Sequence, residues 1–119
     1  MTDRHTVKVG DMFVESWGYD QTNVDVYEVV RVTPKSVALM QGSVTVVNRR
    51  VLPVTGNPTP FDSDYCRVGM PNKRGEVIKR VTRGWRGEPW LSMTSYSGAS
   101  FWDGETSYHD TLVAGMEGH

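Results

Sequence analysis

The chain has 119 residues, a formal net charge of -1 at pH 7 and 38% hydrophobic residues, which suits one domain with a modest core rather than two. This charge excludes the global positive field with which nonspecific nucleic-acid or membrane binders gather their ligands. A single cysteine excludes an intramolecular disulfide. The polar N-terminus predicts no signal peptide, and the lack of any apolar run of about 18 residues predicts no membrane helix. We expect one soluble domain over residues 1–119, with flexible tails at 1–6 and 113–119.

The first half of the chain is rich in Val, Thr and aromatic residues, with turn residues at short intervals, a pattern typical of strands. We predict strands over 12–17, 24–33, 36–41, 44–47 and 51–54. In the second of these, Val24, Val26, Val30 and Val32 share one face, which we expect to be the buried one. Turns are predicted at Pro34-Lys35, at Gly42-Ser43 and over 48–50, and Pro53 indicates an edge strand.

The second half begins with a loop over 55–60 and an irregular segment over 61–74. A second hairpin follows, with strands over 76–83 and 89–96 and a turn over 84–87, whereas no element is predicted after residue 97. Together these elements predict a mostly β fold with little helix. The expected architecture is a small antiparallel meander that forms a barrel, SH3-like or similar, or a sandwich.

Two large aromatic residues and four polar ones crowd the turn between the first two predicted strands. Such a cluster can stack a planar ligand and hydrogen-bond its edge. The alternative is structural: the polar side chains bond neighbouring amides while the first aromatic plugs the end of the barrel. The predicted ligand-binding residues of this turn are Trp17, Tyr19, Asp20, Gln21, Thr22 and Asn23.

A second aromatic and polar group lies near the C-terminus, where Trp102 precedes a turn signal at Asp103-Gly104. We include Trp102 and Asp103 in the predicted ligand site. The alternative is that Trp102 packs as a lid over the end of the sheet.

The charge turns locally basic between residues 73 and 86, where six cationic side chains accompany Trp85 and a single acid, Glu76. Basic side chains beside an aromatic ring form a plausible surface for phosphate and base. The alternative is an ordinary solvated hairpin face. Lys79, Arg80 and Arg83 are the predicted phosphate contacts.

Catalytic signatures are scarce in this chain. The neighbours His109 and Asp110 form the only pair with an acid/base look, and a pair of this kind more often lies in a loop. Nucleophile-elbow, phosphate-loop, dinucleotide and zinc-protease motifs do not occur in the sequence. We therefore predict no enzyme, no cofactor and no metal site.

The segments that carry the aromatic turn also carry a family resemblance. Residues 16–27, Ser-Trp-Gly-Tyr-Asp-Gln-Thr-Asn-Val-Asp-Val-Tyr, with the following 29–37, and the later stretch from Ser95-Tyr96 to Trp102-Asp103-Gly104 resemble a family of short proteins carried by bacteriophages and other mobile elements. This chain departs from the pattern at Val26, where the family usually has Phe, and at 105–107, which replace a more basic run. The resemblance implies an accessory protein acting in the host cytoplasm, and it implies no chemistry.

Small accessory proteins without catalytic signatures commonly work by binding a host protein, a nucleic acid or a signalling nucleotide. The first hypothesis is a noncatalytic binder of a nucleotide or short single-stranded nucleic acid, in which the two aromatic groups stack bases and arginines meet phosphate. The alternative is a protein that binds and inhibits a host protein, for example one of a defence system. The sequence leaves open whether the chain is a monomer or a homo-oligomer.

Overall fold

The computed structural model describes residues 5–17, 22–62, 69–94 and 97–111. The described part of the chain contains seven strands, and no helix in it is long and apolar enough to cross a membrane. The strands are β1 (Met12–Trp17), β2 (Asn23–Val32), β3 (Ser36–Val47), β4 (Arg50–Thr59), β5 (Val77–Arg83), β6 (Pro89–Thr94) and β7 (Ser97–Phe101).

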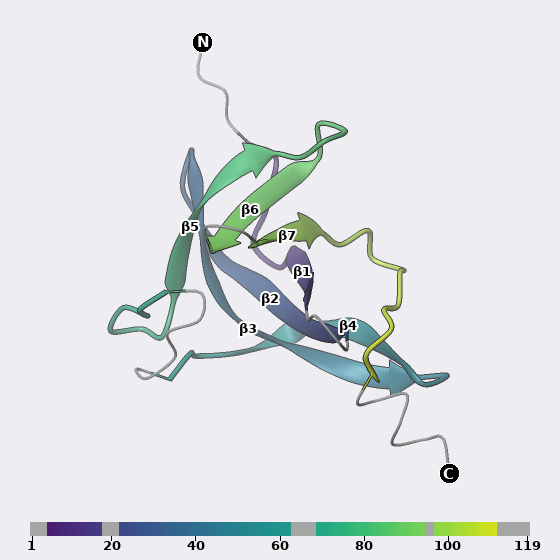
Figure 1. Ribbon diagram of the computed structural model, residues 1–119. Helices are drawn as coiled ribbons and strands as arrows, with labels where there is room; N and C mark the ends of the chain where they lie inside the picture. The colour runs from purple at the N-terminus through teal and green to yellow at the C-terminus, as the bar shows by residue number, and fades with distance from the viewer. Residues whose placement is uncertain (1–4, 18–21, 63–68, 95–96, 112–119) are drawn as a thin grey trace.

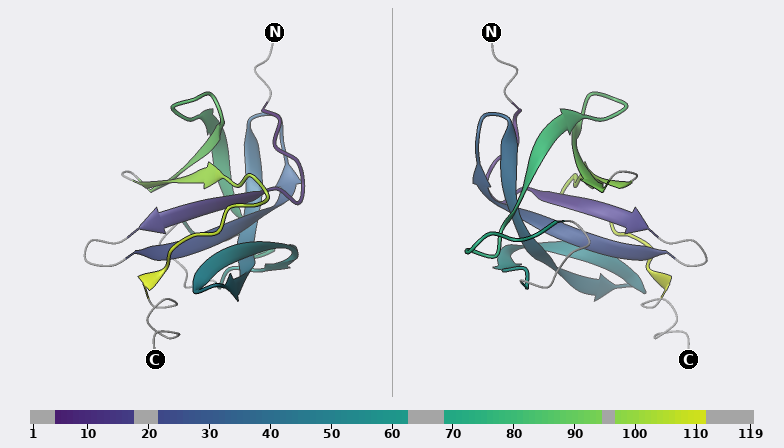
Figure 2. Two further views of the ribbon diagram at one scale, coloured as in Figure 1. Left: turned by 90° about the vertical axis from the view of Figure 1, so that its right-hand side faces the viewer. Right: turned by 60° about the vertical axis from the view of Figure 1, so that its left-hand side comes forward.

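Six of these strands close into an antiparallel barrel (Figures 1 and 2). The order runs β2-β1-β7-β6-β5-β3, and the additional pairing of β2 with β3 completes the ring. The predicted β fold is confirmed, and the barrel rather than the sandwich is formed. The strand order departs from a simple meander in one place, since β3 pairs with both β2 and β5 while β4 lies outside the ring.

The barrel interior holds the main hydrophobic core. Strand alternation points Phe13 of β1 and Tyr27 of β2 inward, and each of the four remaining barrel strands also contributes inward-pointing side chains. The rings of Phe13 and Phe101 meet edge to face, with centroids 5.6 Å apart. The buried members are Val7, Phe13, Tyr27, Val29, Val37, Leu39, Phe61, Val77, Leu91, Met93 and Ala99.

Strand β3 continues well past the barrel and pairs there with β4 alone. The predicted turn at Gly42-Ser43 is therefore wrong. A glycine is needed at position 42 for another reason, because a Cβ there would stand 2.8 Å from both the Met12 and Val26 side chains. The hairpin turns instead at Asn48 and Arg49, both with positive φ, and β4 is an edge strand, as Pro53 indicates.

A second hydrophobic cluster covers the outer face of β1 and β2. Its buried members are Met12, Val14 and Val26, and Trp102 and Tyr108 of the C-terminal segment pack against them. Tyr108 also exchanges two backbone hydrogen bonds with Val51 of β4, at 2.7 and 2.8 Å. Because β2 is buried on both faces, the prediction that its alternating valines mark the single buried face is wrong.

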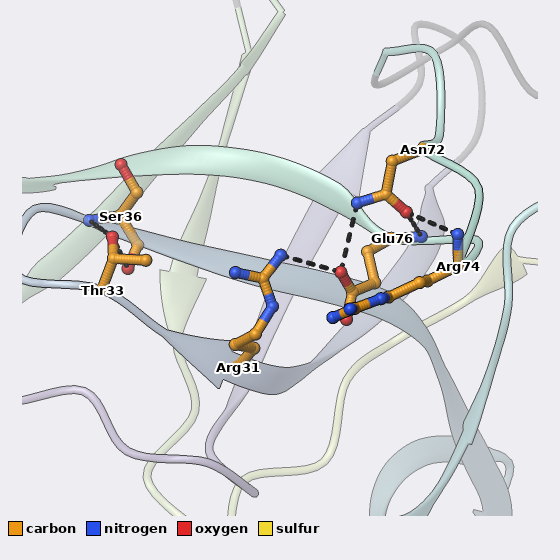
Figure 3. A network of polar contacts seen from close by, with 6 residues as sticks. All are labelled: Arg31, Thr33, Ser36, Asn72, Arg74 and Glu76. Carbon is orange, nitrogen blue, oxygen red and sulfur yellow. Dashed lines mark hydrogen bonds and ion pairs between the residues drawn. The ribbon is translucent and has the colours of Figure 1, made fainter.

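An ion pair ties Arg31 of β2 to Glu76, the residue that precedes β5 (Figure 3). Arg31 donates to the Glu76 carboxylate at 2.9 Å, and the Asn72 amide donates to the same oxygen at 3.2 Å. These hydrogen bonds, that of Arg31 first, outweigh burial and lower the pKa of Glu76 below its ordinary 4.5.

We expect Glu76→Gln to reduce the free energy of unfolding at neutral pH by about 1 kcal/mol, because Arg31 is partly exposed and the pair is partly screened. Since the pKa of Glu76 is depressed in the folded state, this stabilisation is present above pH 4.5 and is lost as pH falls through the depressed value. Urea unfolding at neutral and acidic pH checks this. A wild-type advantage that persists undiminished at acidic pH would contradict the assignment.

Candidate functional site

The turn between β5 and β6 presents the most exposed large hydrophobic side chain of the described residues. The Gly84 N–H donates to the Glu88 carbonyl at 2.7 Å, and the Gly87 N–H donates to the Gly84 carbonyl at 3.1 Å. Gly87 has a φ of 85°, so the loop has the form of a three-residue hairpin turn that ends in a left-handed residue. Trp85 and Arg86 occupy its central positions.

The Glu88 side chain holds this turn in place. Its carboxylate accepts a hydrogen bond from the Arg86 N–H at 2.9 Å, and it lies against Gly84 in the space that a Cβ would fill. Any side chain at position 84 would displace this carboxylate. The turn is therefore fixed before any ligand arrives, which reduces the entropy that binding must cost.

Trp85 is 97% exposed at the tip of this turn. An indole that stays in water contributes no burial free energy to folding. Trp is one of the residues in which binding hot spots are enriched. Arg83 and Arg86 flank it and are exposed too. The tip thus combines an uncovered planar ring with two guanidinium groups.

Positive charge is concentrated on this hairpin. Residues 77–94 carry four cations, Lys79, Arg80, Arg83 and Arg86, against Glu88 alone, a net charge of 4 − 1 = +3, so the rest of the chain carries -1 − 3 = -4. A local patch of this kind attracts anions even though the whole protein is slightly acidic.

The three residues predicted to contact phosphate lie in two different environments. Arg80 and Arg83 are exposed, whereas Lys79 points into the barrel, where its Nζ donates to the Met93 carbonyl at 2.9 Å. Burial lowers the pKa of Lys79, and the charge of Glu15, a buried neighbour bonded to the Tyr27 hydroxyl at 3.0 Å, acts in the opposite direction. Lys79 is therefore part of the barrel's interior polar group.

The strand ends that flank the predicted aromatic turn, Trp17 of β1 and Asn23 of β2, lie at the end of the barrel away from the β2–β3 and β5–β6 turns. Tyr19, Asp20 and Gln21 lie outside the described residues, and of Trp17 only the backbone pairing with Asn23 is described.

The end of this turn is anchored by the C-terminal segment. The Thr22 N–H donates to Thr111 Oγ1 at 2.9 Å, and the Thr111 N–H donates back to the Thr22 carbonyl at the same distance. Asp110, which the sequence offers as an acid/base candidate, accepts a hydrogen bond from the Val24 N–H at 3.1 Å. These contacts hold the start of β2 in place.

Trp102 and Asp103 have structural partners. Trp102 packs against the second hydrophobic cluster, and its Nε1 donates to the Thr106 carbonyl at 2.8 Å. The Asp103 carboxylate accepts from the amides of Glu105 and Thr106 and from the Thr106 hydroxyl, which lowers the pKa of Asp103. These contacts favour the packing role over the ligand role, and they keep both residues away from the β5–β6 hairpin.

Trp85 is the functional candidate that sequence reasoning left out of its site. The signal was present, because Trp85 lies inside the predicted turn at 84–87. The central residues of a tight turn have no neighbouring strand to cover them, so an aromatic residue there is exposed.

No protein-family model matches this chain, and neither a curated protein nor a solved structure matches it. Within residues 5–17, 22–62, 69–94 and 97–111, no group of three or more His, Cys, Asp or Glu side chains could hold a metal ion.

Proposed function

We propose that the protein is a noncatalytic binder of a nucleotide or short single-stranded nucleic acid, and that the β5–β6 hairpin makes the contact. Trp85 stacks on a base, while Arg80, Arg83 and Arg86 meet phosphates. The observation that carries the proposal is the 97% exposure of Trp85 on a fixed turn between two exposed arginines.

Each part of this hairpin fits that chemistry. An exposed indole stacks on any base, because every base has a π-face, and guanidinium groups bind phosphate in a planar, bidentate manner. Moreover, Glu88 is the only acid on the hairpin and is engaged with the turn itself. A phosphate approaching Arg83 or Arg86 therefore meets one opposing charge from this element, that of Glu88, against the charges of the arginines.

Salt dependence tests this proposal. With three arginines on phosphates, we expect the slope of log affinity against log salt to be about -2, from about -0.7 for each phosphate neutralised on a single strand. Arg83→Ala should make the slope shallower by about 0.7. Fluorescence anisotropy of a labelled oligothymidylate, titrated at several salt concentrations, measures both values.

Arg49→Gly is the matched control. It also removes one positive charge, but from the tip of the β3–β4 hairpin, and its φ of 63° is one that glycine adopts without strain. Its salt slope should equal that of the wild type. If both variants changed the slope equally, the effect would be one of net charge, and the hairpin would lose its assigned role.

The second candidate is that the hairpin binds and inhibits a host protein. Exposed Trp and Arg side chains are also the commonest anchors of protein interfaces, which is the observation that favours it. In the phage or mobile-element setting implied by the resemblance, either activity could serve counter-defence in the host cytoplasm. A flat oligonucleotide titration, together with a host protein retained by the wild type but not by Trp85→Ala, would select this candidate.

A further inference from the structure

A second indole lies on the same hairpin, on the outer face of the barrel. Trp90 of β6 is opposite Thr82 of β5 and Ser100 of β7. Its ring leans across to β7 and fills the space in which a Cβ of Gly98 would stand. The Trp90 ring therefore packs directly against the backbone of Gly98.

The side chains around this indole are short and polar. Thr82, Ser92 and Ser100 are its neighbours on the same face, and their short side chains leave the half-buried ring as the bulkiest group there. The C-terminal segment covers β1 and β2 instead. Arg80, exposed and on the same face of β5 as Thr82, supplies a positive charge beside the ring.

The two indoles are too far apart for one base. Trp85 lies three residues along the chain from Thr82, the partner of Trp90, a separation of about 10 Å at about 3.3 Å per residue. A stacked base occupies only about 3.4 Å. Alternation along β5 points the Arg83 side chain to the face opposite that of Thr82, so Arg80 is the arginine of this strand that lies on the same face as the Trp90 ring.

We infer that the ligand is a single-stranded oligonucleotide and not a mononucleotide. One base stacks on Trp85 and another on Trp90 over Gly98, and Arg80, on the face of the Trp90 ring, contacts a backbone phosphate. Stacking on two indoles recognises no base edge, so binding is tolerant of sequence. This inference rests on the proposed function, since it uses the same hairpin.

A length series tests it. Thymidine monophosphate, a dinucleotide and an octanucleotide are titrated by competition against a labelled octanucleotide. We expect the octanucleotide to bind about 5- to 150-fold more tightly than the monophosphate, because one further stacked base contributes about 1–3 kcal/mol. Gly98→Ala, which displaces the Trp90 ring, should lower octanucleotide affinity by a similar factor and leave monophosphate affinity unchanged.

Gly56→Ala is the matched control, because it makes the same substitution on β4, where a Cβ would have nothing within 4 Å, and the folded variant should bind as the wild type does. Should Gly98→Ala fail to fold, as judged by thermal unfolding, Trp90→Thr removes the ring at a position where a strand former is tolerated. Equal affinity for monophosphate and octanucleotide would overturn the two-indole site while leaving the proposed function standing. Absence of binding at every length would overturn both.

Discussion

Replacing Trp85 with alanine is expected to weaken oligonucleotide binding by about 5- to 150-fold, because a stacked base contributes about 1–3 kcal/mol. The melting temperature should stay within error of the wild type, since a side chain that is 97% exposed contributes little to folding and exposed substitutions usually change stability by less than about 0.5 kcal/mol. Anisotropy titration and thermal unfolding of the same preparation measure both quantities.

Two further variants make that result specific. Trp85→Phe keeps a ring and should recover much of the affinity, whereas Val46→Ala, which shortens an exposed apolar side chain of the β3–β4 hairpin, should change nothing. Unchanged affinity of Trp85→Ala would remove the hairpin tip from the binding site. Loss of affinity accompanied by a lowered melting temperature would instead make Trp85 a structural residue.

Gly75→Ala is expected to give the largest loss of stability among these variants, about 2–5 kcal/mol. Gly75 is buried with a φ of 77°, and a Cβ there would overlap the Cβ of Pro60. The backbone conformation costs an L-residue about 1–2 kcal/mol, and the overlap adds a further 1–3 kcal/mol or so. The midpoint of urea unfolding measures the sum.

Gly56→Ala separates the two contributions. Gly56 also has a positive φ, 101°, but a Cβ would have nothing within 4 Å. This variant should therefore lose only about 1–2 kcal/mol. Equal losses in the two variants would show that the Pro60 contact is relieved, and that the Gly75 carbonyl, which accepts from the Phe61 N–H at 2.9 Å, can shift without cost.

Much of the fold could be predicted because its strands are delimited by local turn chemistry. The strand over 12–17 and the turns at 48–50 and 84–87 follow directly from Gly, Asn and β-forming residues. Gly42 was misread because a glycine that admits neighbouring side chains looks the same in sequence as one that makes a turn. β7 was missed because its pattern, Ser-Gly-Ala-Ser-Phe, is set by packing against Trp90 and the core.

The orientation of individual strands was harder to predict. A register irregularity between Val29 and Arg31 of β2, together with burial of both faces, hides the usual alternation of apolar and polar residues. Likewise, nothing in Val-Ile-Lys-Arg-Val tells which cation points inward. Lys79 is interior because it has the Met93 carbonyl of β6 and the charge of Glu15 as partners, and Glu15 comes from β1, which is far away in the sequence.

The candidate site in the structure, the β5–β6 hairpin with Trp85, differs from the aromatic site predicted from the sequence for a related reason. Several aromatic residues near turns look equivalent in sequence, yet Trp102 gains a hydrophobic cluster and a hydrogen bond from the fold, while Trp85 gains neither from the described residues around it. Exposure distinguishes them, and exposure is a property of the tertiary structure. The basic segment was recognisable from sequence, but the separation of Arg80 and Arg83 from Lys79 was not.

The measurement that tests the central claim most directly is a nitrogen-15 correlation spectrum of the four tryptophan indole N–H groups during titration with an oligothymidylate. We predict that the signals of Trp85 and Trp90 shift together and saturate, while that of Trp102, which donates to the Thr106 carbonyl, stays in place. A titration that leaves the Trp85 and Trp90 signals unmoved would contradict the claim that this hairpin binds single-stranded nucleic acid.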